Sequence, residues 1–95
     1  SVYKDGVKLK VDSNYLVPII ESGIVVFIGE KDDYGKTVII EQVDGVNVWY
    51  GNIDNINVSL YDYVSKGELL AEANNSFYMV FQKKGKYIKY QDYLK

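Results

Sequence analysis

Residues 39–50 read IIEQVDGVNVWY, and this stretch decides the fold. It places two β-rich runs on either side of Asp44-Gly45, a dipeptide typical of tight hairpin turns because it tolerates positive φ angles. The second run ends in Trp49 and Tyr50, directly before a small polar turn that contains Asn52. The stretch therefore predicts a β-hairpin whose outgoing strand carries large rings to a polar turn.

The rest of the chain repeats this pattern of short apolar runs broken by Gly, Asp and Asn. Such runs are typical of strands and turns, not of helices with a period of 3.6 residues. A second hairpin is predicted at Lys84-Gly85. Strands are expected at residues 7–11, 23–29, 37–42, 46–50, 68–73, 77–82 and 87–90. The sequence therefore predicts an all-β fold.

Composition limits the domain organisation and the partners. The chain has 95 residues, of which 47% are hydrophobic and 25% charged, which fits a single domain spanning residues 1–95. Its net charge is -2, and its eleven lysines are spread along the chain without any arginine, so nucleic acid is excluded as a partner. No apolar run approaches the roughly 20 residues of a membrane span. The abrupt start at Ser1 indicates an excised fragment, with room for a membrane anchor outside it.

The chain contains neither cysteine nor histidine. The absence of cysteine excludes disulfides, thiol catalysis and cysteine-ligated zinc. The absence of histidine removes the usual general base near neutral pH and the commonest metal ligand. Ser59, Ser65 and Ser76 therefore lack an activating base for nucleophilic catalysis.

Five segments in chain order carry a family resemblance: SGIVVFIGE, KTVIIEQVDG, VWYGNI, VSKGELLAEA and FYMVFQKKGK. In sequence and spacing they resemble the LytM-type domain of the M23 zinc metallopeptidases. The resemblance covers about residues 3–94. It implies a compact β-sheet domain of the duplicated hybrid motif, barrel-sandwich-like, with a groove across one face.

The same resemblance carries the family's site onto five positions. The H-x-x-x-D motif falls on YKDGVKL, so that Lys4 stands for the zinc-binding histidine and Lys8 for the aspartate. The third ligand, the second histidine of H-x-H, falls at Tyr78, and the first falls at Ser76. The remaining catalytic histidine, from Y-x-H-L, falls at Asn52.

These five side chains do not supply what zinc catalysis requires. A catalytic zinc takes about three nitrogen, oxygen or sulfur ligands and keeps one position open for water. Lys4 and Lys8 would bring ammonium groups to the metal, and Asn52 cannot shuttle a proton. We therefore expect a pseudoenzyme without a metal cofactor.

Aromatic residues make up 15% of the chain, including ten tyrosines. Packing within strands is the ordinary role of any single tyrosine. Tyr and Trp are also favoured at protein contacts, because a rigid apolar body carries a polar tip. If the family's groove persists as a shape, we expect Trp49, Tyr50, Asn52 and Tyr78 to line it and to bind a partner.

Residues 49–62, WYGNIDNINVSLYD, narrow the resemblance to degenerate LytM domains of sporulation proteins. In that group a membrane-anchored protein of the outer forespore membrane holds its LytM-like domain in the space between the two forespore membranes. It scaffolds and regulates an intramembrane protease, which stays inactive with its inhibitor until a signalling protease arrives. The resemblance thus implies an extracytoplasmic domain with protein partners.

Two other functions stay open. A degenerate LytM domain can activate a cell-wall hydrolase or pair with another LytM domain across an intercellular channel. A lipoyl or hybrid-barrel carrier has similar strands and needs a modified lysine at a hairpin tip, where QKKGKY offers Lys83, Lys84 and Lys86. The ordinary role of that turn is a solvated surface hairpin.

Overall fold

The structure is a computed structural model that describes residues 1–93. The last two residues of the expected 1–95 domain lie outside the described part. In chain order the elements are β1 (Val2–Tyr3), β2 (Gly6–Lys10), β3 (Tyr15–Pro18), β4 (Gly23–Lys31), β5 (Gly35–Gln42), β6 (Asn47–Gly51), β7 (Tyr63–Val64), β8 (Leu69–Ala73), β9 (Ser76–Lys83), β10 (Lys86–Ile88) and α1 (Tyr90–Tyr93).

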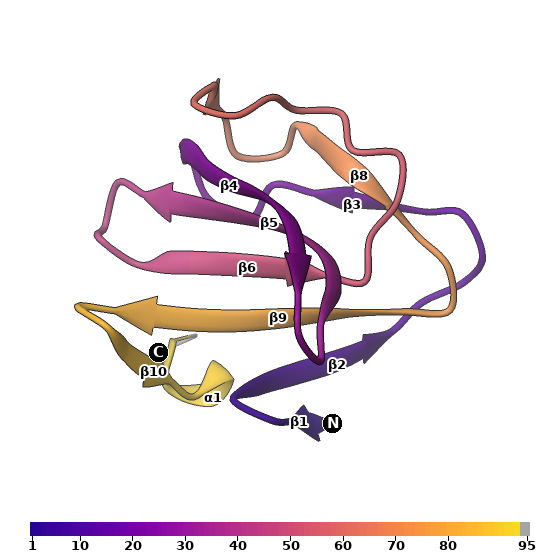
Figure 1. Cartoon of the computed structure of the whole chain (residues 1–95), viewed down its shortest axis with the longest axis horizontal. Coiled ribbons are helices and arrows are strands. Elements are labelled where there is room, and N and C mark those ends of the chain that lie inside the picture. The colour runs from indigo at the N-terminus through magenta and orange to yellow at the C-terminus, as the bar shows by residue number, and fades with distance from the viewer. Residues whose placement is uncertain (94–95) are drawn as a thin grey trace.

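The described strands form two antiparallel sheets (Figure 1). The larger sheet has eight strands in the order β1-β2-β9-β6-β5-β4-β7, with β10 paired to β9, and the smaller sheet contains β3 and β8. β9 is flanked on both edges. β6 pairs with residues 78–82 along one edge, and β2 and β10 follow each other along the opposite edge.

The hydrophobic core lies between the larger and the smaller sheet. Successive side chains of a strand point to opposite faces, so β9 sends Phe77, Met79 and Phe81 into the core and Tyr78 to the outer face. The smaller sheet supplies Val17 from β3 together with apolar residues of β8. The predicted all-β fold is confirmed.

Both predicted hairpins form, but their turns differ. Lys84 (φ 52°) and Gly85 (φ 78°) both adopt the left-handed conformation of a two-residue turn between β9 and β10. Between β5 and β6 only Gly45 has a positive φ, of 85°, and the Val46 amide donates to the Asp44 carboxylate (3.0 Å). The expectation of positive φ angles across Asp44-Gly45 is therefore wrong for Asp44.

The end of the chain also departs from the prediction. The strand expected at residues 87–90 ends at Ile88, and α1 follows it. The ring centroids of Tyr90 and Tyr93 lie 5.6 and 4.5 Å, respectively, from the ring centroid of Phe81. This aromatic packing explains why the chain folds back over β9 instead of continuing as a strand. Among the described residues, no helix has the length and apolar character needed to cross a membrane.

Candidate functional site

The outer face of β9 brings together most of the positions that the family resemblance assigns to the site. Tyr78 pairs with Lys8 of β2 on one side and with Gly51 of β6 on the other. Directly paired residues project from the same face of a sheet. Lys8 and Tyr78 therefore lie side by side, facing away from the core.

Tyrosine rings fill the space around Tyr78. The Tyr3 ring stacks on the Tyr78 ring with centroids 4.3 Å apart. The Tyr34 ring stands edge-on to both, at 5.8 Å from each centroid, and edge-on to Trp49 at 5.7 Å. Edge-to-face and offset arrangements are the favoured geometries of aromatic pairs. We call Tyr3, Tyr34, Trp49 and Tyr78 the aromatic cluster.

Hydrogen bonds hold two rings of the cluster, Tyr3 at the end of β1 and Tyr34 in the turn between β4 and β5. The Tyr3 hydroxyl donates to the Asp33 carbonyl (2.9 Å), and the Asp5 amide donates to the Tyr34 hydroxyl (3.1 Å). These bonds connect the β1–β2 hairpin to the turn between β4 and β5. The hairpin is thereby fastened over the outer face of the sheet.

Two phenols of the cluster, those of Tyr3 and Tyr34, favour their neutral form. Tyr34 is 7% exposed, and this burial raises the pKa of its hydroxyl, while the hydrogen bond donated by the Asp5 amide offsets part of the rise. Loss of solvent contact also raises the pKa of Tyr3, followed by its interaction with Tyr78. Both shifts disfavour the phenolate, which is the form a metal would need.

Asn52 and Ser76 lie together beside the cluster. The Asn52 amide donates from Nδ2 to the Ser76 carbonyl (3.1 Å), which joins the end of β6 to the start of β9. Asn52 has a φ of 59°, in the left-handed region where asparagine is among the best tolerated residues. The side chain therefore has a local structural task at this strand end.

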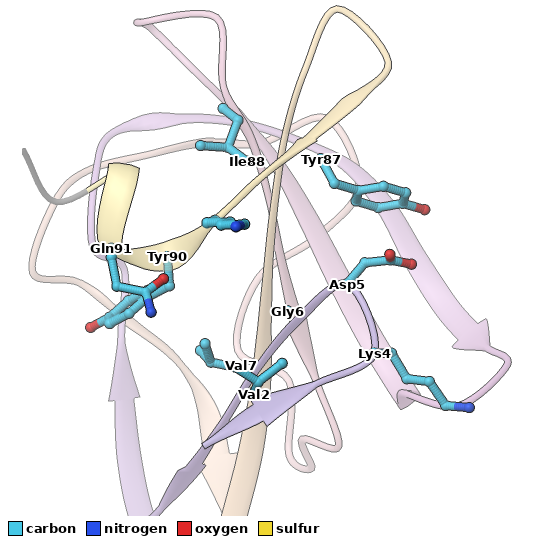
Figure 2. A pocket seen from close by; sticks show the side chains of 10 residues that line it. Val2, Lys4, Asp5, Gly6, Val7, Tyr87, Ile88, Tyr90 and Gln91 are labelled. Carbon is cyan, nitrogen blue, oxygen red and sulfur yellow. The ribbon is translucent and has the colours of Figure 1, made fainter.

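Lys4 is separated from the other four positions. It occupies the turn between β1 and β2 with a φ of 53°, and its side chain is exposed. Figure 2 shows the Lys4 side chain extending outward from the turn of the hairpin, away from Val2 and Val7. In its place Tyr3, one residue earlier, reaches the outer face.

The expected groove residues divide between two faces. Trp49 faces outward, where its Nε1 donates to Gln82 Oε1 (3.1 Å) and the Lys31 ammonium lies 5.1 Å from its ring. Tyr50 points into the core and is fully buried, and its hydroxyl accepts the Ile20 amide (3.0 Å). Its expected place in a groove is therefore wrong, because residues 49 and 50 of one strand must face opposite ways.

A zinc ion does not fit the side chains at the assigned ligand positions. Lys8 offers an ammonium group, Lys4 turns away, and the Tyr78 ring is stacked on Tyr3 at 4.3 Å. In residues 1–93 no group of three or more His, Cys, Asp or Glu side chains could hold a metal. The donors that zinc requires are therefore missing at this place.

Sequence reasoning missed Tyr3 and Tyr34, the two rings that complete the cluster. They lie 31 positions apart and outside every predicted strand, Tyr3 in the short strand β1 and Tyr34 in a turn. The available signal was the abundance of tyrosine together with Tyr34-Gly35 at a turn. That signal does not identify which rings meet.

The comparisons with known proteins agree with this architecture. The model of peptidase family M23 matches residues 2–91. Stage IV sporulation protein FA of Bacillus subtilis (strain 168) is 30% identical over 66 residues, which cover 70% of this chain and 25% of that protein. The chain thus spans about a quarter of the length of this relative.

Solved structures of similar fold include three bacterial M23 proteins. A putative M23 peptidase from Pseudomonas aeruginosa has a TM-score of 0.82 and 18% identity, covering 94% of this chain and 43% of its own. The catalytic domain of the prophage-encoded M23 protein EnpA from Enterococcus faecalis has a TM-score of 0.78 and 17% identity, with coverages of 90% and 74%. Lysostaphin from Staphylococcus simulans has a TM-score of 0.76 and 21% identity, with coverages of 85% and 38%. These similarities establish a LytM-like fold.

Proposed function

The chain belongs to peptidase family M23, and we propose that it is a non-catalytic member whose LytM-type domain binds protein partners. The aromatic cluster carries this proposal, since Tyr3, Tyr34 and Tyr78 pack together where the family resemblance assigns the metal. We treat residues 1–95 as one such domain. Its proposed role is recognition without cleavage.

The site lacks a general base as well as metal ligands. Asn52 and Ser76 stand at the positions assigned to the catalytic histidines, and neither an amide nor a serine hydroxyl ionises near neutral pH, so neither can act as a general acid or base there. Asn52 is engaged with the Ser76 carbonyl. In our proposal, therefore, no residue at these positions activates water or transfers a proton, the two catalytic roles of the family.

The proposed biological setting is a sporulation complex. The similarity to stage IV sporulation protein FA supports this setting. In our proposal the domain scaffolds and regulates an intramembrane protease, together with its inhibitor and a signalling protease. It lies outside the cytoplasm, in the space between the forespore membranes, and a segment outside this chain anchors it in the outer forespore membrane.

The proposed contact surface is the outer face around the aromatic cluster. Trp49 and Tyr78 are half-buried and Asn52 is exposed, so each keeps surface that a partner can touch. The Lys31 ammonium lies over the rings of both Trp49 and Phe27, at 5.1 and 4.6 Å from their centroids. Rigid rings with a polar border are favoured at protein contacts. Tyr50 is left out of this surface because it is fully buried.

Metal analysis and a murein assay test the non-catalytic role. The purified domain should contain no stoichiometric zinc after dialysis against zinc, and it should not solubilise peptidoglycan. A zinc-loaded peptidase that cleaves the same murein, run in parallel, supplies the positive control for both measurements. One zinc per chain, or release of soluble muropeptides by this domain, would refute the proposal.

Partner capture separates the sporulation complex from its alternatives. Cross-linking in sporulating cells should recover the intramembrane protease complex, and changing Trp49 or Tyr78 to Ala should reduce the yield. Recovery of a cell-wall hydrolase or of another LytM domain instead would favour the activator or channel role. A lipoyl or biotinyl adduct on Lys83, Lys84 or Lys86, visible by intact mass, would favour the carrier role.

A further inference from the structure

A cavity of about 490 Å³ lies between the β1–β2 hairpin and the segment that joins β10 to α1 (Figure 2). Apolar side chains from both segments line it, among them Val2, Val7, Ile88 and Tyr90. Val2 is 76% exposed, so the cavity is reached from the surface beside it. The space is therefore an open, mostly apolar hollow, and none of Asn52, Ser76 and Tyr78 lines it.

The pairing of β9 produces this hollow. β2 pairs with β9 as far as Met79, and β10 pairs with β9 from Phe81 onward along the same edge. The cavity lies where the pairing of β9 changes from β2 to β10. Among the described residues β10 pairs only with β9, so its outer edge is free to accept an extended chain.

A lysine-rich segment runs from the β9–β10 hairpin to the hollow. Residues 83–89 contain four lysines and no acidic residue, although the whole chain has a net charge of -2. All four lysines are exposed, and Lys89 lines the cavity itself. The other charged lining residues are Lys4 and Asp5, one of each sign. The β9–β10 hairpin therefore presents a local positive surface on a chain that is otherwise acidic.

We propose that this hollow and the lysine-bearing hairpin bind an extended acidic segment of a partner protein. One apolar side chain of the segment enters the cavity, and neighbouring carboxylates lie near Lys86 and Lys89. A flat lipid surface would meet the lysines but could not fill the hollow, so the combination favours a peptide. This inference rests on the proposed role in protein recognition and identifies a second surface and its partner chemistry.

Peptide binding measures the two parts of the proposal separately. The first probe is a short fluorescein-labelled peptide with a central phenylalanine flanked by glutamates. Replacing the phenylalanine by alanine should weaken binding about tenfold, because the apolar ring is no longer buried. Replacing the glutamates by lysines should abolish binding. Fluorescence anisotropy at fixed ionic strength reports each dissociation constant.

Variants of the domain test the assigned residues. The double change Lys86→Glu and Lys89→Glu should weaken binding of the acidic phenylalanine probe about tenfold, and Val2→Glu should weaken it by a similar factor. The double change Lys36→Glu and Lys66→Glu is the matched control, because it makes the same charge change at two exposed residues that do not line the cavity. It should leave the dissociation constant within about twofold. Circular dichroism verifies that each variant is folded.

Three outcomes would overturn the inference: equal affinity for the phenylalanine and alanine probes, equal weakening by the control pair Lys36→Glu and Lys66→Glu, or binding to phosphatidylserine vesicles without binding to the peptide. The last would identify the hairpin as a lipid-binding surface. These results are independent of zinc content and murein cleavage. Failure of the peptide test therefore leaves the non-catalytic role standing, and discovery of zinc would leave the peptide result standing.

Discussion

The two sides of the β1–β2 hairpin differ in how they are packed. On one side Tyr3 stacks on Tyr78 and contacts Tyr34, so aromatic rings occupy the outer face of the sheet. On the other side Val2 and Val7 border a hollow of about 490 Å³. The two residues of β1 thus face different surroundings: Val2 borders the open hollow, and Tyr3 belongs to the filled aromatic cluster.

The two sides of the hairpin should contribute differently to folding stability and to partner binding. Tightly packed rings contribute dispersion and hydrophobic energy and leave little room for a ligand. An open apolar hollow contributes less to the folded state and can accept a side chain from elsewhere. We therefore expect changes in the aromatic cluster to alter unfolding, and changes around the hollow to alter binding alone.

The largest effect is expected for Tyr34→Ala. Tyr34 is 7% exposed and its ring contacts those of Tyr3, Trp49 and Tyr78. Truncation should lower the free energy of unfolding by about 3 kcal/mol, the range for large aromatic side chains in cores. Urea denaturation measures the loss. Tyr63→Ala, at a ring that is 61% exposed, should cost less than about 1 kcal/mol, and equal losses would contradict the difference between buried and exposed rings.

A pH titration should produce the second effect. Burial raises the pKa of Tyr34, and that of Tyr50 still more, above the usual value near 10. The unfolded chain therefore loses these protons first. The stabilisation is fully present below about pH 10 and falls as the pH rises through the folded pKa values, by at most about 1.4 kcal/mol per pH unit for each phenol.

Urea unfolding between about pH 8 and 11 measures this fall. Tyr34→Phe should show a shallower decline than the unaltered chain, since one ionising phenol has been removed. Tyr63→Phe, at an exposed ring, should decline in parallel with the unaltered chain. Parallel curves for all three proteins would contradict the burial of Tyr34.

A smaller effect is expected at the border of the filled surface. Asn52→Ala removes the hydrogen bond to the Ser76 carbonyl and places alanine at a φ of 59°, so it should cost about 1 kcal/mol or slightly more. Asn52→Gly loses the same bond but accepts the backbone conformation, and it should cost less. Thermal or urea unfolding of the pair separates the two contributions. Equal losses for alanine and glycine would show that the backbone conformation carries no strain.

The smallest effect is expected at the hollow. Val2 is 76% exposed, and Val2→Glu should change the free energy of unfolding by less than about 0.5 kcal/mol, as is usual for surface substitutions. The same denaturation experiment measures it. A loss comparable to that of Tyr34→Ala would mean that the hollow supports the fold as much as the cluster does.

Much of the sheet was predictable because its strands alternate and its turns are marked. The strand expected at residues 23–29 is extended by two residues in β4, and that at 37–42 begins two residues earlier in β5. The unpredicted strands β1, β3 and β7 have two, four and two residues. Such short segments become strands because they pair with a neighbouring strand. A local sequence pattern does not show that pairing.

The candidate site was less predictable than the sheet. The family resemblance placed Lys8, Asn52, Ser76 and Tyr78 in one region, and they do meet around the pairing of β2, β6 and β9. Tyr50 was misplaced because the strand period of two was not applied to the step from Trp49 to its neighbour. The role of Tyr3 depends on a contact with a turn about thirty residues away, which only the folded chain brings near.

β9 has hydrogen-bonded neighbours on both of its edges, and this gives the domain a rigid centre. Successive amides of residues 78–82 point to opposite edges of β9, and both edges are paired along most of this segment, so their exchange should require opening of the central sheet and approach the rate of global unfolding. Those of β10, with one paired edge, should exchange through local opening. A segment that adds to the free edge of β10 would slow that local exchange, and the change would locate its binding without any mutation.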